Sequence, residues 1–169
     1  MSEKEIKKFI DEAYKEALKA YSKDEVPVGA VIVKDGKIIG RGHNLRVSEN
    51  NALLHAEIVA IQDACKNINN WRLDGATLIV TNEPCVMCTG AIMQARISEV
   101  IFCSLNQKMG AILSNLNILD YNNITFKVKY KYEPDEKCSK ILTDYFKHKR
   151  GRNIEENTFN SIYNNGSPS

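Results

Sequence analysis

The first part of the chain alternates apolar and charged residues with the period of an α-helix. Its apolar positions are Ile6, Phe9, Ile10, Ala13, Ala17 and Leu18. Lys and Glu side chains fill the positions between them, so the apolar side chains share one face. This pattern predicts an amphipathic helix over residues 3–21.

Short apolar runs rich in Val and Ile predict the strands. These runs are residues 26–33, 38–39, 77–81, 100–103 and 124–132. Asp35-Gly36 separates the first two runs, and this pair favours the tight turn of a β-hairpin. The last run alternates apolar residues with lysine, which is typical of an exposed strand.

Three further helices are predicted, over residues 52–65, 85–95 and 135–149. Pro84 suits the first turn of the second of these helices, because its missing N–H would have no partner there. Residues 46–51 are polar and predict a loop. The alternation of helices and strands predicts an α/β sandwich whose sheet is mostly parallel after the hairpin.

Length and composition describe one globular domain. The 169 residues are 43% hydrophobic and 26% charged, which argues against disorder and against a collagen-like chain. No apolar run approaches the roughly 18–20 residues of a membrane span, and the charged N-terminus lacks a secretory signal. We therefore expect a cytoplasmic protein without membrane contact, with one domain over residues 1–150 and a polar, flexible tail over residues 151–169.

The five cysteines argue against a disulfide framework, because their number is odd and the chain lacks a secretory signal. Cys65, Cys103 and Cys138 lie in apolar patterns and are predicted to be buried thiols. Cys85 and Cys88 differ, because they stand three apart at the start of a predicted helix and share one face of it. The positive end of the helix dipole favours thiolates there, and thiolates bind Zn²⁺.

The string His55-Ala56-Glu57 supplies the rest of a candidate metal site. With imidazole as third ligand, His55, Cys85 and Cys88 predict a zinc with an open fourth position, as in catalytic zinc sites. Glu57 is then predicted to act as a general base that shuttles protons from a bound water. Taken alone, the CxxC pair also suits a redox pair or half of a structural zinc site.

Together the two strings match the H-x-E…P-C-x-x-C pattern of zinc nucleobase deaminases. Over residues 3–150 the chain resembles the bacterial tRNA-specific adenosine deaminases. The stretches that carry this resemblance are Glu25–Ala30, Gly42–Asn44, His55–Ile58, Asn70–Leu73, Asn82–Ala91 and Tyr145–Arg150. The resemblance implies a three-layer α/β/α cytidine-deaminase-like sandwich with a five-stranded mixed sheet. It also implies a homodimer with one Zn²⁺ per subunit, which converts adenosine to inosine at the wobble position of a tRNA anticodon.

The resemblance also assigns residues to the substrate. It implies that Asn44 hydrogen-bonds the base and that Val28, Ala30 and Pro84 contribute to the pocket around it. The chain departs from the residues usual in the family at Leu54, Asn82 and Asn106.

The net charge of +2 does not by itself indicate nucleic-acid binding, so local clustering of charge matters. Basic residues do cluster toward the C-terminus. The residues predicted to contact RNA are Asn106, Lys108, Lys147, Lys149, Arg150 and Arg152. Phosphate contacts by such residues would position the anticodon stem-loop without reading its bases. The alternative for the basic cluster is a solvated helix face.

Two other functions remain open from the sequence. One is a zinc-dependent deaminase of a free base or nucleotide, of the guanine or cytosine type. The basic C-terminal helix argues against it, because a small neutral base needs no surface that follows phosphates. The other is a non-catalytic, zinc-stabilised RNA-binding module. Glu57 and the missing fourth protein ligand argue against that function.

Overall fold

The computed structural model describes residues 1–164, with side-chain detail as far as residue 152. Its centre is a five-stranded sheet with strand order β2-β1-β3-β4-β5. The strands are β1 (Gly29–Lys34), β2 (Lys37–His43), β3 (Thr77–Val80), β4 (Glu99–Phe102) and β5 (Lys129–Tyr132). β1 pairs antiparallel with both of its neighbours, whereas β3, β4 and β5 are parallel, so the predicted mixed sheet is confirmed.

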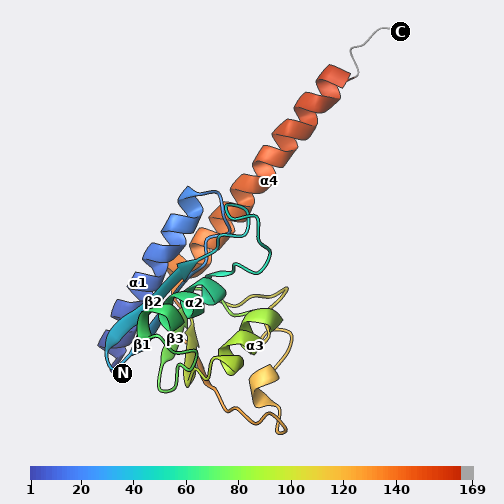
Figure 1. Ribbon diagram of the computed structural model, residues 1–169. Coiled ribbons are helices and arrows are strands. Elements are labelled where there is room, and N and C mark those ends of the chain that lie inside the picture. The colour runs from blue at the N-terminus through green and yellow to red at the C-terminus, as the bar shows by residue number, and fades with distance from the viewer. Residues whose placement is uncertain (165–169) are drawn as a thin grey trace.

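Helices cover both faces of the sheet and complete three layers (Figure 1). They are α1 (Glu3–Ser22), α2 (Ala56–Ile68), α3 (Val86–Gln94) and α4 (Glu136–Asn164), with a short 3₁₀ turn, η1 (Ile118–Asp120). α1 and the first turn of α4 pack on one face, and α2 and α3 pack on the other. The predicted three-layer α/β/α fold is therefore confirmed. Beyond its first turns, α4 extends away from the sheet (Figure 1).

The side chains of β1 show how the two hydrophobic cores divide. Ala30 and Ile32 face the core shared with α2 and α3, while Val31 and Val33 face the core shared with α1. Next to β1, Gly42 lets α2 approach the sheet closely, because a Cβ atom there would overlap the backbone of that helix. This close contact fixes the N-terminal end of α2 over the sheet.

Two predicted boundaries were wrong around the second helix and the last strand. α2 begins at Ala56 rather than at residue 52, because the Asn51 side chain accepts a hydrogen bond from the N–H of Leu53 and forms a turn there. β5 covers only four residues of the predicted run 124–132, because its partner β4 is itself only four residues long.

The last helix is longer than predicted. It was expected to end at Lys149, and it continues to Asn164. No proline lies between Lys149 and Asn164, and the one glycine in that stretch, Gly151, costs a helix only about 1 kcal/mol relative to alanine. The rest of the predicted tail, residues 165–169, lies outside the described residues. Among the residues that are described, no helix is long and apolar enough to cross a membrane.

Candidate functional site

Three side chains from two helix starts meet at one end of the sheet. His55 is the N-cap of α2, Cys85 is the N-cap of α3, and Cys88 lies one turn into α3. The Nδ1 atom of His55 is 3.6 Å from Sγ of Cys85 and 3.5 Å from Sγ of Cys88. Typical Zn–S and Zn–N bonds of about 2.3 and 2.0 Å at a tetrahedral angle place such atoms about 3.5 Å apart. The three donors are therefore spaced to hold zinc, and their ligand atoms all lie within 4.8 Å of one another.

The protonation of these donors also suits a metal. The neighbouring Cys88 thiol lowers the pKa of Cys85 to about 4, so Cys85 is a thiolate at neutral pH. Cys85 in turn raises the pKa of Cys88 well above its ordinary value. A hydrogen bond with Cys85 raises the pKa of His55. The centre thus holds one thiolate, Cys85, and one thiol, Cys88, whose proton a divalent cation can displace.

Asn44 holds the start of α2 in place. Its Oδ1 accepts a hydrogen bond from the N–H of Ala56 at 2.8 Å, and its Nδ2 donates one to the carbonyl of Val26 at 2.9 Å. An amide side chain has a second N–H and a second lone pair, so Asn44 can form further hydrogen bonds. Asn44 also lines the same cleft as His55 and Cys85. Its predicted hydrogen bond to a base stays a prediction.

Glu57 is only 4% exposed and lines the same cleft as His55. Burial raises the pKa of this carboxyl above its ordinary value. Because His55 precedes the first helical residue, the two side chains reach one cleft although they stand two apart in sequence. Glu57 lies outside the three-residue metal group, which leaves it free to exchange protons with whatever occupies the cleft.

The cleft in front of the metal group has a volume of about 940 Å³, which is enough for a nucleoside with its neighbours. Val28 and Asn82 line it, but Ala30, Pro84 and Leu54 are not among its lining residues. Ala30 is fully buried in β1, and the carbonyl of Pro84 accepts a hydrogen bond from Ala111. Leu54 is half-buried and does not narrow the cleft.

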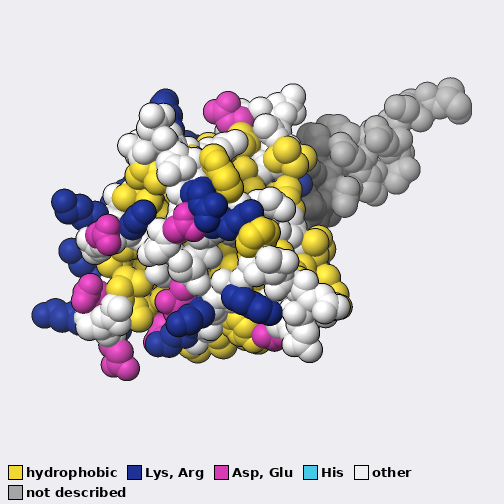
Figure 2. Space-filling model, turned by 60° about the horizontal axis from the view of Figure 1, so that its bottom comes forward, with side chains coloured by type: hydrophobic (Ala, Val, Ile, Leu, Met, Phe, Trp, Pro, Cys, Tyr) yellow, Lys and Arg dark blue, Asp and Glu magenta, His cyan; other side chains and the backbone are white. Residues whose placement is uncertain are grey.

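The predicted RNA-binding residues divide into two groups. Those that line the cleft are Asn106, Lys108, Lys149 and Arg150. Lys147 is exposed outside the cleft, and Arg152 pairs with Asp24 at 3.4 Å. Arg46 also lines the cleft, and sequence reasoning missed it because it stands alone in a polar loop. On the surface that Figure 2 shows, lysines and arginines are scattered among acidic and hydrophobic side chains.

Two buried glutamates, one in each of the stretches Glu25–Ala30 and Asn82–Ala91, hold the walls of the cleft. Glu25 is 1% exposed, and its carboxylate accepts hydrogen bonds from the N–H groups of Val47 and Ser48. Glu83 is 2% exposed and binds the chain between Asn106 and Ser114 in the same way. Burial alone would raise the pKa of Glu83, but the hydrogen bonds that it accepts from Ser114 and from backbone N–H groups lower it.

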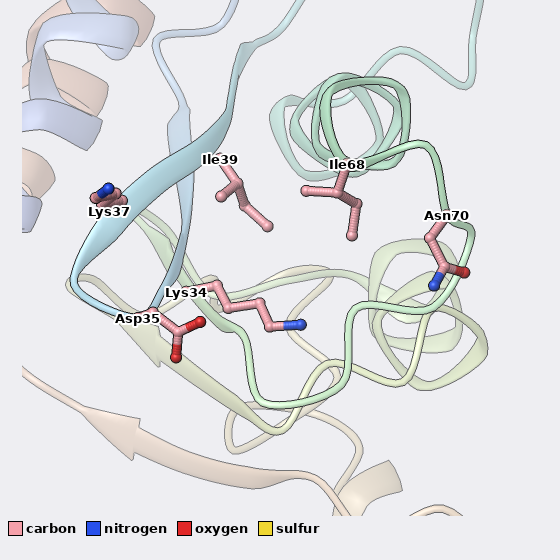
Figure 3. A pocket seen from close by; sticks show the side chains of 6 residues that line it. All are labelled: Lys34, Asp35, Lys37, Ile39, Ile68 and Asn70. Carbon is pink, nitrogen blue, oxygen red and sulfur yellow. The ribbon is translucent and has the colours of Figure 1, made fainter.

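A second hollow lies between the β1–β2 hairpin and the C-terminal end of α2 (Figure 3). Ile39 and Ile68 face each other across it, and Lys34 extends toward the side of Asn70. None of its lining residues belongs to the metal group, so it is separate from the cleft described above.

Comparison with known proteins places this geometry in a family. The family model "Cytidine and deoxycytidylate deaminase zinc-binding region" matches residues 3–104. A tRNA-specific adenosine deaminase of Aquifex aeolicus is 43% identical over 146 residues, which cover 86% of this chain and 97% of that protein.

Solved structures agree with this placement. One, from a study of A-to-I editing by tRNA:A34 deaminases at the wobble position of transfer RNA, is 36% identical with a TM-score of 0.77. The alignment covers 80% of this chain and 99% of that one. A guanine deaminase from Bacillus subtilis is 37% identical with a TM-score of 0.57, over 62% of this chain and 66% of that one. The chain belongs to the zinc-dependent cytidine and deoxycytidylate deaminase family, within its branch of tRNA-specific adenosine deaminases.

Proposed function

We propose that this protein hydrolyses adenosine to inosine at the wobble position of a tRNA anticodon and releases ammonia. The observation that carries the proposal is the group of His55, Cys85 and Cys88 beside the buried carboxyl of Glu57, in a cleft with basic residues on its walls. A relative 43% identical to the chain is named a tRNA-specific adenosine deaminase. Hydrolytic deamination needs an acidified water and one proton carrier, and the cleft supplies residues for both.

The residues of the chain divide this work. When bound by His55, Cys85 and Cys88, zinc would supply a Lewis acid that makes water a nucleophile near neutral pH. Glu57 takes the proton from that water and gives it to N1 of adenine, which makes C6 open to attack. Glu57 then moves the proton of the hydroxyl group now bonded to C6 to the amino group, the C6–N bond breaks, and ammonia leaves while the C6 carbonyl forms. The burial of Glu57 helps this exchange, because a raised pKa lets the carboxyl hold a proton between steps.

The remaining cleft residues position the substrate. The base must leave its stack to reach the metal group, and an anticodon loop allows this at low cost. Asn44 and Val28 lie beside the metal donors, where they would contact the flipped base. Arg46, Lys108 and Arg150 stand on three different segments around the cleft, where they would contact the phosphates on either side of it.

Deamination of free guanine is the second candidate, because a guanine deaminase shares the fold at 37% identity. The basic residues that line the cleft favour RNA over a free base. We further propose that the active protein is a cytoplasmic homodimer with one zinc per subunit, in keeping with a tRNA substrate. Size-exclusion chromatography with light scattering and metal analysis tests the stoichiometry.

Inosine measured after incubation with transcribed tRNAs tests the function. We expect inosine only in tRNAs that carry adenosine at the wobble position, and none in matched transcripts with guanosine there. Parallel incubations with free adenosine and free guanine should release no ammonia above background. Ammonia from free guanine without inosine in tRNA would reject the proposal in favour of the second candidate.

A further inference from the structure

The carboxylate of Glu83 is almost out of contact with solvent and accepts hydrogen bonds from one continuous loop. Oε2 accepts the N–H groups of Ile112, Leu113 and Ser114 at 3.1, 2.8 and 3.0 Å. Oε1 accepts the N–H of Asn106 at 3.2 Å and the hydroxyl of Ser114. Five donors on nine residues of chain therefore converge on one side chain.

The same loop forms a wall of the substrate cleft. Leu105, Asn106, Gln107, Lys108 and Met109 all line it. Their backbone has few other anchors to the body of the protein, because these residues lie between β4 and η1 and outside any strand or helix. Where this wall lies therefore depends strongly on the Glu83 side chain.

Glu83 also connects this wall to the metal group. Only Pro84 separates it from Cys85, and the carbonyl of Pro84 accepts the N–H of Ala111 at 2.9 Å. Two consecutive residues before a metal donor thus bind the loop from Asn106 to Ser114, Glu83 through its side chain and Pro84 through its backbone.

Gly110 leaves room for the Glu83 carboxylate at the centre of the loop. A Cβ atom at this position would overlap the carboxylate and would lie 2.6 Å from the carbonyl oxygen of Asn106. The loop therefore closes around the carboxylate only because position 110 has no side chain.

We propose that Glu83 is a positioning residue for the substrate: its buried carboxylate sets the distance between the 105–109 wall and the metal group. This inference rests on the proposed function. The wall contacts the nucleotides that flank the target base, whereas the chemistry belongs to Glu57 and the metal donors. Loss of the carboxylate therefore weakens substrate binding and leaves the chemical step largely intact.

The variant Glu83→Gln tests this role with almost no change in volume. A carboxylate accepts at both oxygens, but an amide puts N–H groups at one of them, where they would face a backbone N–H or the Ser114 hydroxyl. Lost hydrogen bonds to a charged group are costly, so we expect KM for an anticodon stem-loop to rise about tenfold or more. We expect kcat to change less than about threefold, and zinc content to stay the same.

Two controls separate positioning from general loss of stability. Glu16→Gln also removes a buried carboxylate with several partners, but in α1, on the opposite face of the sheet, and should leave KM unchanged. Ser114→Ala removes one of the five donors and keeps the carboxylate, so its KM should rise by less than that of Glu83→Gln. If Glu83→Gln fails to fold, Ser114→Ala carries the test at smaller amplitude, because the Ser114 hydroxyl is the one side-chain donor among the five.

Hydrogen exchange gives a readout that needs no turnover. The amides of residues 106–114 should exchange faster in Glu83→Gln, while those of α2 and β3 keep their protection. An unchanged KM with unchanged exchange in this loop, in a wild-type protein that produces inosine, would overturn the inference. An equal loss in kcat and in zinc would do so as well. Failure of the wild type to produce inosine would instead reject the proposed function. The exchange measurement would then still decide whether Glu83 holds the loop of residues 106–114 in place.

Discussion

At the scale of single residues, Glu57 combines burial with contact to the cleft. Because we assign it the proton transfers and not the metal, Glu57→Ala should keep zinc and tRNA affinity while turnover falls by about 10² to 10⁴. Metal analysis, a binding titration and inosine yield measure the three quantities on one preparation. An inosine yield near that of the wild type would contradict the assignment.

A change at Cys88 should remove the metal itself, whereas a change at Glu57 should leave the metal in place. Cys88→Ala removes one of three donors, so co-purifying zinc should fall far below one ion per chain. Cys103→Ala is the matched control, because Cys103 is equally buried but lies on the other face of the sheet. Zinc content measured by mass spectrometry should separate the two variants. Full occupancy in Cys88→Ala would show that the ligand set is wrong.

The residues that sequence reasoning found and missed differ in how they act. His55, Cys85 and Cys88 could be predicted because metal binding demands particular side chains at particular spacings, and the structure brings these three together. The sequence did not predict that Glu25 and Glu83 anchor loops, because each of them binds backbone N–H groups. Such donors are the same in every residue type, so the loops that fold onto a glutamate leave no signature in the sequence.

At the scale of elements, the contact between α1 and β2 depends on Glu16. Burial alone would raise the pKa of this carboxyl, but hydrogen bonds from His43 and Lys19 outweigh it and lower the pKa to about 2. A carboxyl with a lower pKa in the folded chain stabilises the fold above its unfolded pKa. That stabilisation, about 3 kcal/mol at neutral pH, is lost as the pH falls from about 4.5 toward 2.

Chemical denaturation as a function of pH measures this contribution. Glu16→Gln should be less stable than the wild type at pH 7, and the difference should shrink steadily between about pH 4.5 and pH 2. Glu3→Gln changes an exposed position in the same helix. Its stability should differ little from that of the wild type at both pH 7 and pH 2. If the loss of stability in Glu16→Gln is the same at every pH, the charge of Glu16 does not contribute to stability.

Element boundaries were harder to predict than element types. The order of helices and strands follows from periodicity, and every predicted helix and strand exists. The start of α2 was misplaced because the Asn51 turn competes locally with the helix, and apolar spacing does not report such competition. The end of α4 was misplaced because polar residues after Lys149 were interpreted as a tail, although polar residues also suit a helix that projects from the protein.

At the scale of the whole molecule, topology explains why the site lies where it does. β3 and β4 are parallel neighbours, so the segments that follow them, Asn82–Cys85 and Leu105–Met109, emerge at the same edge of the sheet. The start of α2 reaches that edge because β2 runs antiparallel to β1 and delivers Asn44 beside it. α4 then passes the same edge and brings Lys149 and Arg150 to the cleft. Parts of the chain about 100 residues apart thus enclose one cleft, as expected for open α/β sheets.

The basic residues in the middle of α4 offer a test of how the whole molecule binds RNA. Lys149 and Arg150 line the cleft, whereas Lys147 does not and Arg152 pairs with Asp24. Replacing Lys149 and Arg150 by Gln should weaken tRNA binding and flatten the dependence of log affinity on log salt by about 0.7 to 0.9 per lost phosphate contact. Adding Lys147→Gln and Arg152→Gln should change the slope little further.

Binding titrations at several salt concentrations measure the slope for each variant. Lys4→Gln with Lys7→Gln makes the matched control, because it removes two exposed charges from α1 and none from the cleft. Zinc content and turnover at saturating tRNA should stay near wild type in all of them, because these lysines and arginines position the RNA and lie outside the metal group. Equal slopes for the wild type and the Lys149 and Arg150 variant would mean that this part of α4 is a solvated helix face. The phosphates would then have to be held by Arg46 and Lys108 on the other walls of the cleft.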